Sequence, residues 1–289
     1  MKILKTGTLL ILLSVLLVVA GDALAGRTGM KIALAFAVVM NAISYFFSDK
    51  IALMTSGAQP VTRDQLPRLY AVVEQLAAKA GIPVPKLYVI PEAAPNAFAT
   101  GRNPRHASVA VTEGLLQLMN DEELEGVIAH ELSHVRNYDI LTSSIAATIA
   151  GAVTYLAHMA QWGMLFGGYG SRDDDREGGG GGLAAILMMI LAPFAALLLQ
   201  LFLSRTREYA ADETGARMVG QPYGLISALQ KLGAYNQRIP TTVVPPATGA
   251  LCIVQPLFGR GGLSSLFSTH PPLEERIAAL REMSIVPQR

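Results

Sequence analysis

The chain has 289 residues, enough for one substantial catalytic domain or for a smaller domain with several membrane spans. Hydrophobic residues make up 51% and charged residues only 16%, which favours a membrane protein. The formal net charge of +1 sets aside nucleic acid as a partner, and the lone Cys252 excludes an intrachain disulfide and a cysteine-based zinc knuckle.

Two apolar stretches near the beginning of the chain predict a transmembrane helical hairpin. They cover about residues 7–21, after Lys2 and Lys5, and about residues 32–47. A helix needs about 20 apolar residues to cross a bilayer. The basic start, short apolar core and small residues of the first stretch also fit a cleavable signal peptide. The second apolar stretch follows at once, which favours an uncleaved anchor.

A second hairpin is predicted from about 140–166 and 183–203, on either side of a glycine-rich polar loop at 167–182. The alternative is a pair of buried core helices in a soluble domain. The stretch 183–203 contains no charged residue, and that favours a span. The stretch 140–166 contains several polar residues, which are tolerated where helices pack together.

The residues between the hairpins have globular character. An amphipathic helix is expected at 64–80, followed by short strands at 86–90, 96–100 and 107–112. Asn120 can cap a helix at 121–136, with Glu123 completing a capping box. After the second hairpin, a helix continues to Val219, residues 236–270 are loop-like, and 273–283 forms a last amphipathic helix. This order predicts an α+β fold, mainly helical with a small β-sheet.

The segment His130-Glu131-Leu132-Ser133-His134 is an HExxH pattern on the helix at 121–136. The i, i+4 spacing places both imidazoles on one face, within reach of one tetrahedral zinc ion, and Glu131 can act as general base. The alternative is a surface helix with two ordinary histidines. A catalytic zinc also needs a third protein ligand and an open position for water.

Glu208 is the third ligand that the sequence favours. Glu208 and Asp212 lie four residues apart on a second helix, so one can bind the metal while the other orients a ligand histidine. The alternative is a solvated acidic face with arginine partners. His158 lies in an apolar stretch and His106 in a polar turn, and neither position suits a ligand.

These residues resemble the HtpX-like membrane zinc metallopeptidases, which are related to the CAAX prenyl proteases. The resemblance rests on the N-terminal hairpin and on four segments: 95–101 (PNAFATG), 130–134 with Asp139, 205–212 (RTREYAAD) and 268–272 (STHPP). It implies a gluzincin-type peptidase domain with one zinc ion held by His130, His134 and Glu208. Asp212 would not bind the zinc itself but would orient one of the ligand histidines.

Further roles are implied by the resemblance alone. Asn96, on an edge strand, would bind substrate backbone, although it could equally be a turn residue after Pro95. His270 is a candidate to stabilise the developing oxyanion, or it only shapes the Pro-Pro turn that follows. Tyr209 and Arg205 compete with it for the oxyanion role.

The position of the motifs predicts a site just off the bilayer surface. About five residues, or about 8 Å of helix, separate His134 from the start of the second hairpin, and the end of that hairpin at Leu203 from Glu208. Protein substrates that are themselves membrane proteins are therefore expected. The basic residues around the first hairpin mildly favour a cytoplasmic catalytic domain. The resemblance implies a multi-pass protein of a bacterial inner membrane that removes damaged membrane proteins under stress.

The expected organisation has four parts: a transmembrane hairpin at 1–50, the first part of the catalytic domain at 51–139, the second hairpin at 140–203 and the second part of the catalytic domain at 204–289. One rival is an intramembrane protease with its zinc motif inside a span, but charged residues flank this motif. The other is a membrane scaffold or transporter with structural zinc or none, which would not need Glu131.

Overall fold

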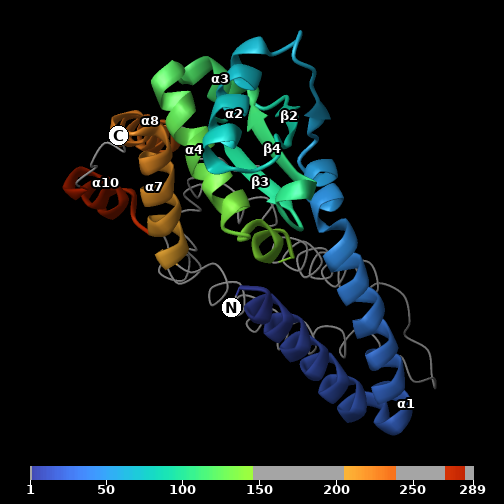
Figure 1. Cartoon of the computed structure of the whole chain (residues 1–289). Coiled ribbons are helices and arrows are strands. Elements are labelled where there is room, and N and C mark those ends of the chain that lie inside the picture. Colours follow the sequence, from blue (N-terminus) through green and yellow to red (C-terminus); the bar gives the residue numbers. More distant parts are fainter. Residues whose placement is uncertain (1, 146–204, 239–270, 284–289) are drawn as a thin grey trace, which may run out of the picture.

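The chain begins with a long helix that folds back on itself. The computed structural model describes residues 2–145, 205–238 and 271–283. Helix α1 (Lys2–Thr55) reverses direction near Gly26, whose φ of 56° lies in the left-handed region that favours glycine. The two arms lie side by side (Figure 1), and Asn41 Nδ2 donates a 2.8 Å hydrogen bond to Ser14 Oγ across them. The helical hairpin expected here is present.

The second arm of α1 has the length and the surface of a membrane helix. Among the described residues, the segment Gly26–Thr55 is the one helix long and apolar enough to cross a membrane. Large apolar side chains such as Ile32, Phe36 and Val38 are more than half exposed on it. An exposed apolar surface of this extent is stable in contact with lipid rather than with water.

A four-stranded mixed sheet follows α1, in the order β1-β2-β4-β3. β2 (Lys86–Ile90) pairs in parallel with β4 (Ala107–Thr112), while β1 (Gln59–Pro60) and β3 (Ala97–Gly101) add antiparallel edges. The 3-10 turn η1 (Pro104–His106) connects β3 to β4. β3 is thus the edge strand of this sheet among the described residues, as the resemblance implied. On its outward side, the amides of Ala97, Ala99 and Gly101 are bound by the side chains of Asn96, Glu131 and Ser144.

The two faces of the sheet pack against different partners because side chains alternate along each strand. Val109 and Val111 of β4 face the main core, which includes α2 (Pro67–Ala80) and α4 (Asp121–Arg136). Ala110 and Phe98 face the opposite way and pack against Ala52 and Leu53 at the end of α1. The apolar helix is therefore packed directly on the strand pair β3 and β4.

Helix α4 lies at the centre of the globular part of the molecule, where α2, α7 (Arg205–Val219) and α8 (Tyr223–Arg238) pack against it (Figure 1). α3 (Glu113–Leu118) precedes it in the chain. α10 (Leu273–Glu282) then covers α7 and α8, with Leu280 buried among Ala216 and Leu229.

Most predicted elements are confirmed, with three differences. The helix expected from residue 64 begins at Pro67, because a residue before proline avoids the helical region and Leu66 has a ψ of 65°. The strand expected at 96–100 lies one residue later. Helix α8 was not predicted, and it extends through 236–238, where a loop was expected. Residues 140–145 are helical, and the rest of the second hairpin lies outside the described residues.

Candidate metal centre

The helix that carries the HExxH segment is held firmly at its beginning. Asn120 and Glu123 form the predicted capping box, with the Asn120 side chain bound to the Glu123 amide and the Glu123 side chain bound to the Asn120 amide. Glu123 also accepts hydrogen bonds from Ser227 (2.6 Å) and Lys231 (2.7 Å) of α8. These bonds fix the start of α4 against a second helix, two turns before the histidines.

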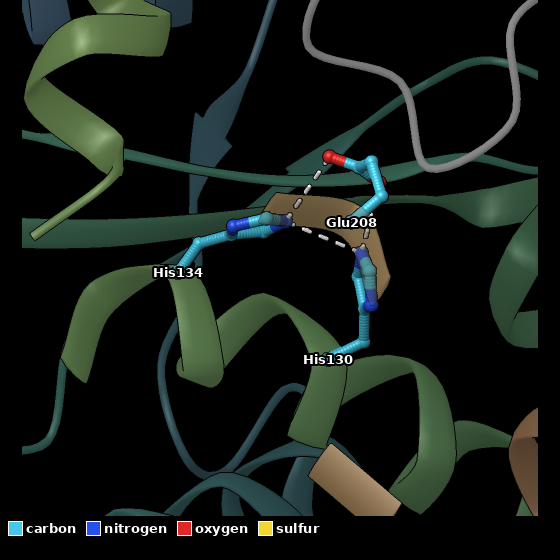
Figure 2. Close-up of side chains that lie close together, drawn as sticks. All are labelled: His130, His134 and Glu208. Atoms are coloured by element: carbon cyan, nitrogen blue, oxygen red, sulfur yellow. Dashed lines mark hydrogen bonds and ion pairs between the residues drawn. The ribbon is translucent and has the colours of Figure 1, made fainter. Parts of the chain in front are cut away.

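His130 and His134 lie on the buried side of α4 and face each other (Figure 2). Their Nε2 atoms are 3.3 Å apart, and their rings are nearly perpendicular, with centroids 4.8 Å apart. The His130 side chain is 1% exposed and that of His134 is 16% exposed. Access to the pair from solvent is therefore on the His134 side.

Glu208 reaches the same point from α7 (Figure 2). Its carboxylate oxygens lie 3.6 Å from His130 Nε2 and 3.7 Å from His134 Nε2. One donor atom from each residue lies within 4.8 Å of the others, and no other such group occurs among the described residues. Donor atoms about 2.1 Å from one tetrahedral zinc ion are about 3.4 Å from each other. The three side chains thus have the types and the spacing of metal ligands.

Two carboxylates stand behind the imidazoles. Asp212 Oδ1 accepts a 2.8 Å hydrogen bond from His130 Nδ1, and Asp139 Oδ2 lies 3.7 Å from His134 Nδ1. Burial lowers the pKa of His130 and outweighs the carboxylate beside it. For His134, burial acts in the same direction, but Asp139 and Glu208 outweigh it and raise the pKa. The acidic surroundings of His134 favour a positive charge there, which a metal cation supplies.

Glu131 is buried beside this group, with 4% of its surface exposed. Its Oε2 accepts a 2.8 Å hydrogen bond from the amide of Ala99 on β3. Burial raises the pKa of the Glu131 carboxyl to about 8. The side chain of Glu131, the predicted general base, therefore joins α4 to the outward side of the edge strand β3.

A buried arginine, Arg276, is also part of this site. The sequence did not predict its role. Arg276 of α10 binds both oxygens of Asp212, through Nε at 2.8 Å and Nη2 at 2.6 Å. The sequence contained one signal for it, because Arg276 occupies the apolar stripe of its helix between Leu273 and Leu280. An arginine in a core position needs a buried acidic partner.

The other predicted site residues are placed less centrally. Asn96 precedes β3, its amide and carbonyl bind Thr112, and its Oδ1 accepts the amide of Ala97. The Tyr209 hydroxyl donates to Glu275 of α10 at 2.9 Å, so an oxyanion role would require that bond to break. Arg205 is exposed. His270 and His158 lie outside the described residues.

Comparisons with known proteins agree with this geometry. The chain matches the family described as Peptidase family M48 over residues 63–284. A protease HtpX homolog of Desulfatibacillum aliphaticivorans is 56% identical over 276 residues, which cover 96% of this chain and 88% of the relative. A protease HtpX homolog of Syntrophotalea carbinolica is 53% identical over 286 residues, which cover 99% of this chain and 100% of the relative.

A solved structure shows the same fold. The crystal structure of S. mikatae Ste24p matches 96% of this chain with a TM-score of 0.52 and 20% identity, and the chain spans 64% of the length of that protein. The fold and the paired histidines with their acidic partner define a metallopeptidase associated with the membrane. The chain belongs to peptidase family M48. The resemblance to HtpX-like peptidases is thereby confirmed.

Proposed function

We propose that the chain is a membrane-anchored zinc endopeptidase with His130, His134 and Glu208 as ligands and Glu131 as general base. One observation carries this proposal: three donor atoms from two helices meet within 4.8 Å, beside a buried carboxylate that is not one of the three. Two imidazoles and one carboxylate, without a thiol, are a known donor set of catalytic zinc in peptidases. The gluzincin type follows from Glu208 as third ligand.

The residues around the metal have separate tasks in hydrolysis. A bound zinc ion would polarise the scissile carbonyl and make water acidic enough to attack at neutral pH. The Glu131 carboxylate would take the proton of the attacking water and deliver it to the nitrogen of the leaving amine. A zinc cation bound beside Glu131 would favour its ionised form, which is the form that accepts a proton. Asp212 would keep the His130 Nδ1 protonated, so that Nε2 faces the metal.

The outward edge of β3 is the proposed binding site of the substrate backbone, and a peptide there would displace the side chains that bind its outward amides. Thr112 donates its amide to the Asn96 carbonyl, so alternate residues of β3 face β4 and those between them face outward. Ala99 is one of the outward residues, and its amide reaches Glu131. An extended peptide added at this edge would run past the general base. Asn96 lies at the beginning of that edge, where its side-chain amide would bind the peptide.

The substrates are proposed to be membrane proteins. Phe98, next to Ala99, packs on Ala52 and Leu53 at the end of the apolar helix. A membrane-spanning second arm would therefore hold the substrate edge close to the bilayer surface. Loops and juxtamembrane segments of damaged membrane proteins fit this position, which supports a role in quality control during stress.

The proposed topology has both N-terminal arms, and the hairpin at 140–203, crossing a bacterial inner membrane. The proposed division of the chain into four parts, with boundaries after residues 50, 139 and 203, follows from this topology. Basic residues support a cytoplasmic catalytic domain, because they lie mainly on the side of the N-terminus and of the sheet. These residues are Lys2, Lys5, Lys50, Arg63 and Arg68, against Arg27 and Lys31 in the intervening turn.

Metal content and cleavage, measured on the same preparation, test the proposal. The full-length protein in detergent should contain one zinc ion per chain and cleave casein and a model membrane protein. Glu131→Gln should keep its zinc and lose cleavage by at least about 100-fold, since general base catalysis contributes 10²–10⁴-fold. Glu122→Gln, at an exposed position of α4, is the matched control.

Three results would overturn parts of this proposal. Zinc-loaded wild-type protein that cleaves no substrate would favour a scaffold or transporter. Equal cleavage by Glu131→Gln would remove Glu131 from the mechanism. Full zinc content in His130→Ala would place the metal elsewhere.

A further inference from the structure

Arg276 is one of the most deeply buried charged side chains among the described residues. Arg276 is 1% exposed and lies on α10. It follows Asp212 by 64 residues in the chain. Its guanidinium binds Asp212 in the two-pronged geometry that only arginine offers to a carboxylate. Pro272 directly precedes α10, and its carbonyl accepts the Arg276 amide at 3.2 Å, so the start of the helix determines where the Arg276 side chain enters the core.

The position of Arg276 relative to the metal ligands is specific. Its Nη2 lies 2.6 Å from Asp212 Oδ1, the oxygen that also binds His130 Nδ1 at 2.8 Å. The same nitrogen is 3.5 Å from His130 Nδ1, and Nη1 is 3.8 Å from Glu208 Oε2. Because arginine has no acceptor, it cannot replace Asp212 as the partner of the His130 N–H. Its bonds to both oxygens of Asp212 can instead hold that carboxylate in place.

This contact fixes the direction in which His130 presents its free nitrogen. A carboxylate held by both oxygens cannot rotate about its Cβ–Cγ bond. Its Oδ1 then accepts the His130 proton from one direction, and Nε2 faces Glu208 and His134. Burial alone would lower the pKa of Arg276, but the Asp212 carboxylate outweighs burial and raises it, so the guanidinium remains charged.

We propose that Arg276 is a positioning residue of the metal centre, which strengthens metal binding by orienting Asp212 and, through it, His130. The proposal rests on the proposed function of His130, His134 and Glu208 as ligands. It makes α10 a part of the metal site, although the helix supplies no ligand. Metal binding and the docking of α10 then stabilise each other.

Charge and geometry make opposite predictions for this residue, which gives a sharp test. A cation 3.8 Å from a ligand carboxylate repels a second cation, so electrostatics alone predicts tighter zinc binding when Arg276 is neutralised. Positioning predicts weaker binding, because an acidic partner behind a ligand histidine contributes about 10–100-fold to metal affinity. The sign of the change therefore separates the two effects.

The experiment measures zinc affinity of the full chain in detergent by competition with a chromophoric chelator. Arg276→Gln should bind zinc about 10-fold or more weakly. Arg276→Lys keeps the charge but loses the two-pronged contact, and it should lose most of the affinity as well. Arg281→Gln, at an exposed position of the same helix, is the matched control and should bind like the wild type.

A double substitution keeps the test valid if a single variant folds poorly. Asp212→Asn combined with Arg276→Gln removes both buried charges, which avoids an unpaired ion in the core. If Arg276 acts through Asp212, the double variant should lose no more affinity than Asp212→Asn alone. Additive losses would show that Arg276 does not act through Asp212. Far-UV circular dichroism and thermal unfolding of the zinc-free proteins report whether each variant is folded.

The outcomes also separate this proposal from the one on which it rests. If His130→Ala retains zinc, the proposed site is wrong. If His130→Ala loses zinc while Arg276→Gln binds as tightly as the wild type, or more tightly, only the role of Arg276 is refuted. Hydrogen exchange of residues 273–282 should slow when zinc is added, and an unchanged rate would contradict the coupling between α10 and the metal.

Discussion

Gly215 of α7 lies directly against the backbone of His130 in α4. A Cβ at position 215 would be 2.9 Å from the His130 nitrogen and 3.1 Å from the carbonyl carbon of Ala129. Both neighbours are backbone atoms, which cannot turn away as a side chain can. The absence of a side chain at Gly215 thus sets the spacing of the two helices that carry the proposed metal ligands.

Gly215→Ala should push α7 away from α4 and weaken the site. Overpacking costs about 1–3 kcal/mol, partly offset by the better helix propensity of alanine, about 1 kcal/mol. We expect a lower melting temperature and weaker zinc binding. Gly233→Ala in α8 is the matched control, since its new Cβ meets only the flexible end of Leu273, at 2.9 Å. Equal zinc affinity in both variants would show that the spacing is not critical.

Asp212 and Asp139 stand behind the two histidines, but at different distances. Asp212 is 2.8 Å from His130 Nδ1, whereas Asp139 is 3.7 Å from His134 Nδ1. Asp212→Asn should therefore lower zinc affinity by about 10-fold or more, and Asp139→Asn by a smaller factor. Chelator competition measures both. The reverse order would mean that the distance between each carboxylate and its histidine does not determine its contribution to zinc affinity.

Glu123 should make the stability of the protein dependent on pH. Burial alone would raise its pKa, but the bonds from Lys231, Ser227 and Asn120 outweigh burial and lower it below the ordinary value of 4.5. A lowered pKa in the folded state adds stability above about pH 4.5, and this is lost as the pH falls through the folded pKa. Glu123→Gln should cost about 1–2 kcal/mol at neutral pH.

Thermal unfolding in detergent at pH 7 and pH 4 checks this expectation. The difference in melting temperature between wild type and Glu123→Gln should be smaller at pH 4 than at pH 7. At pH 4 a larger fraction of the wild-type Glu123 is protonated, and a protonated Glu123 is neutral like the glutamine of the variant. Glu122→Gln, exposed and one residue away, should differ little from wild type at pH 7. A difference in melting temperature that increases toward low pH would contradict the lowered pKa of Glu123.

The second arm of α1 should be shielded by lipid. A cysteine at Val38, which is 61% exposed on the apolar segment Gly26–Thr55, should resist a membrane-impermeant maleimide in vesicles and react after detergent is added. The background carries serine in place of Cys252, the one native cysteine. Ala78→Cys, on the exposed face of α2, is the control for reagent activity. Rapid labelling at position 38 in intact vesicles would argue against a membrane span.

The sequence predicted those parts of the fold whose determinants are local. β2, β4 and α4 have the predicted bounds, because proline, glycine and the Asn120 cap mark them in the chain. The HExxH spacing likewise places two imidazoles together through helix geometry alone. Helix α8 was overlooked although Leu225, Leu229 and Leu232 have helical spacing.

Contacts between distant segments were harder to predict. Arg276 reaches Asp212 only after α10 has packed on α7, and no spacing in the sequence encodes that approach. The bond between Ala99 and Glu131 involves a backbone amide, which every residue except proline has. Gly215 gave no signal either, because a glycine in a helix is interpreted as a weak point until the neighbouring helix is known.

The separation of the ligands along the chain also has a consequence in time. Glu208 follows His134 by 74 residues, and Arg276 comes later still. A ribosome adds about 5–20 residues per second, so about 4–15 s pass between the synthesis of the second histidine and that of its acidic partner. During this interval the nascent chain carries the HExxH helix without a complete hydrolytic centre. If His134 and Glu208 are both ligands, as proposed, the nascent chain cannot cleave its own unfolded segments during this interval.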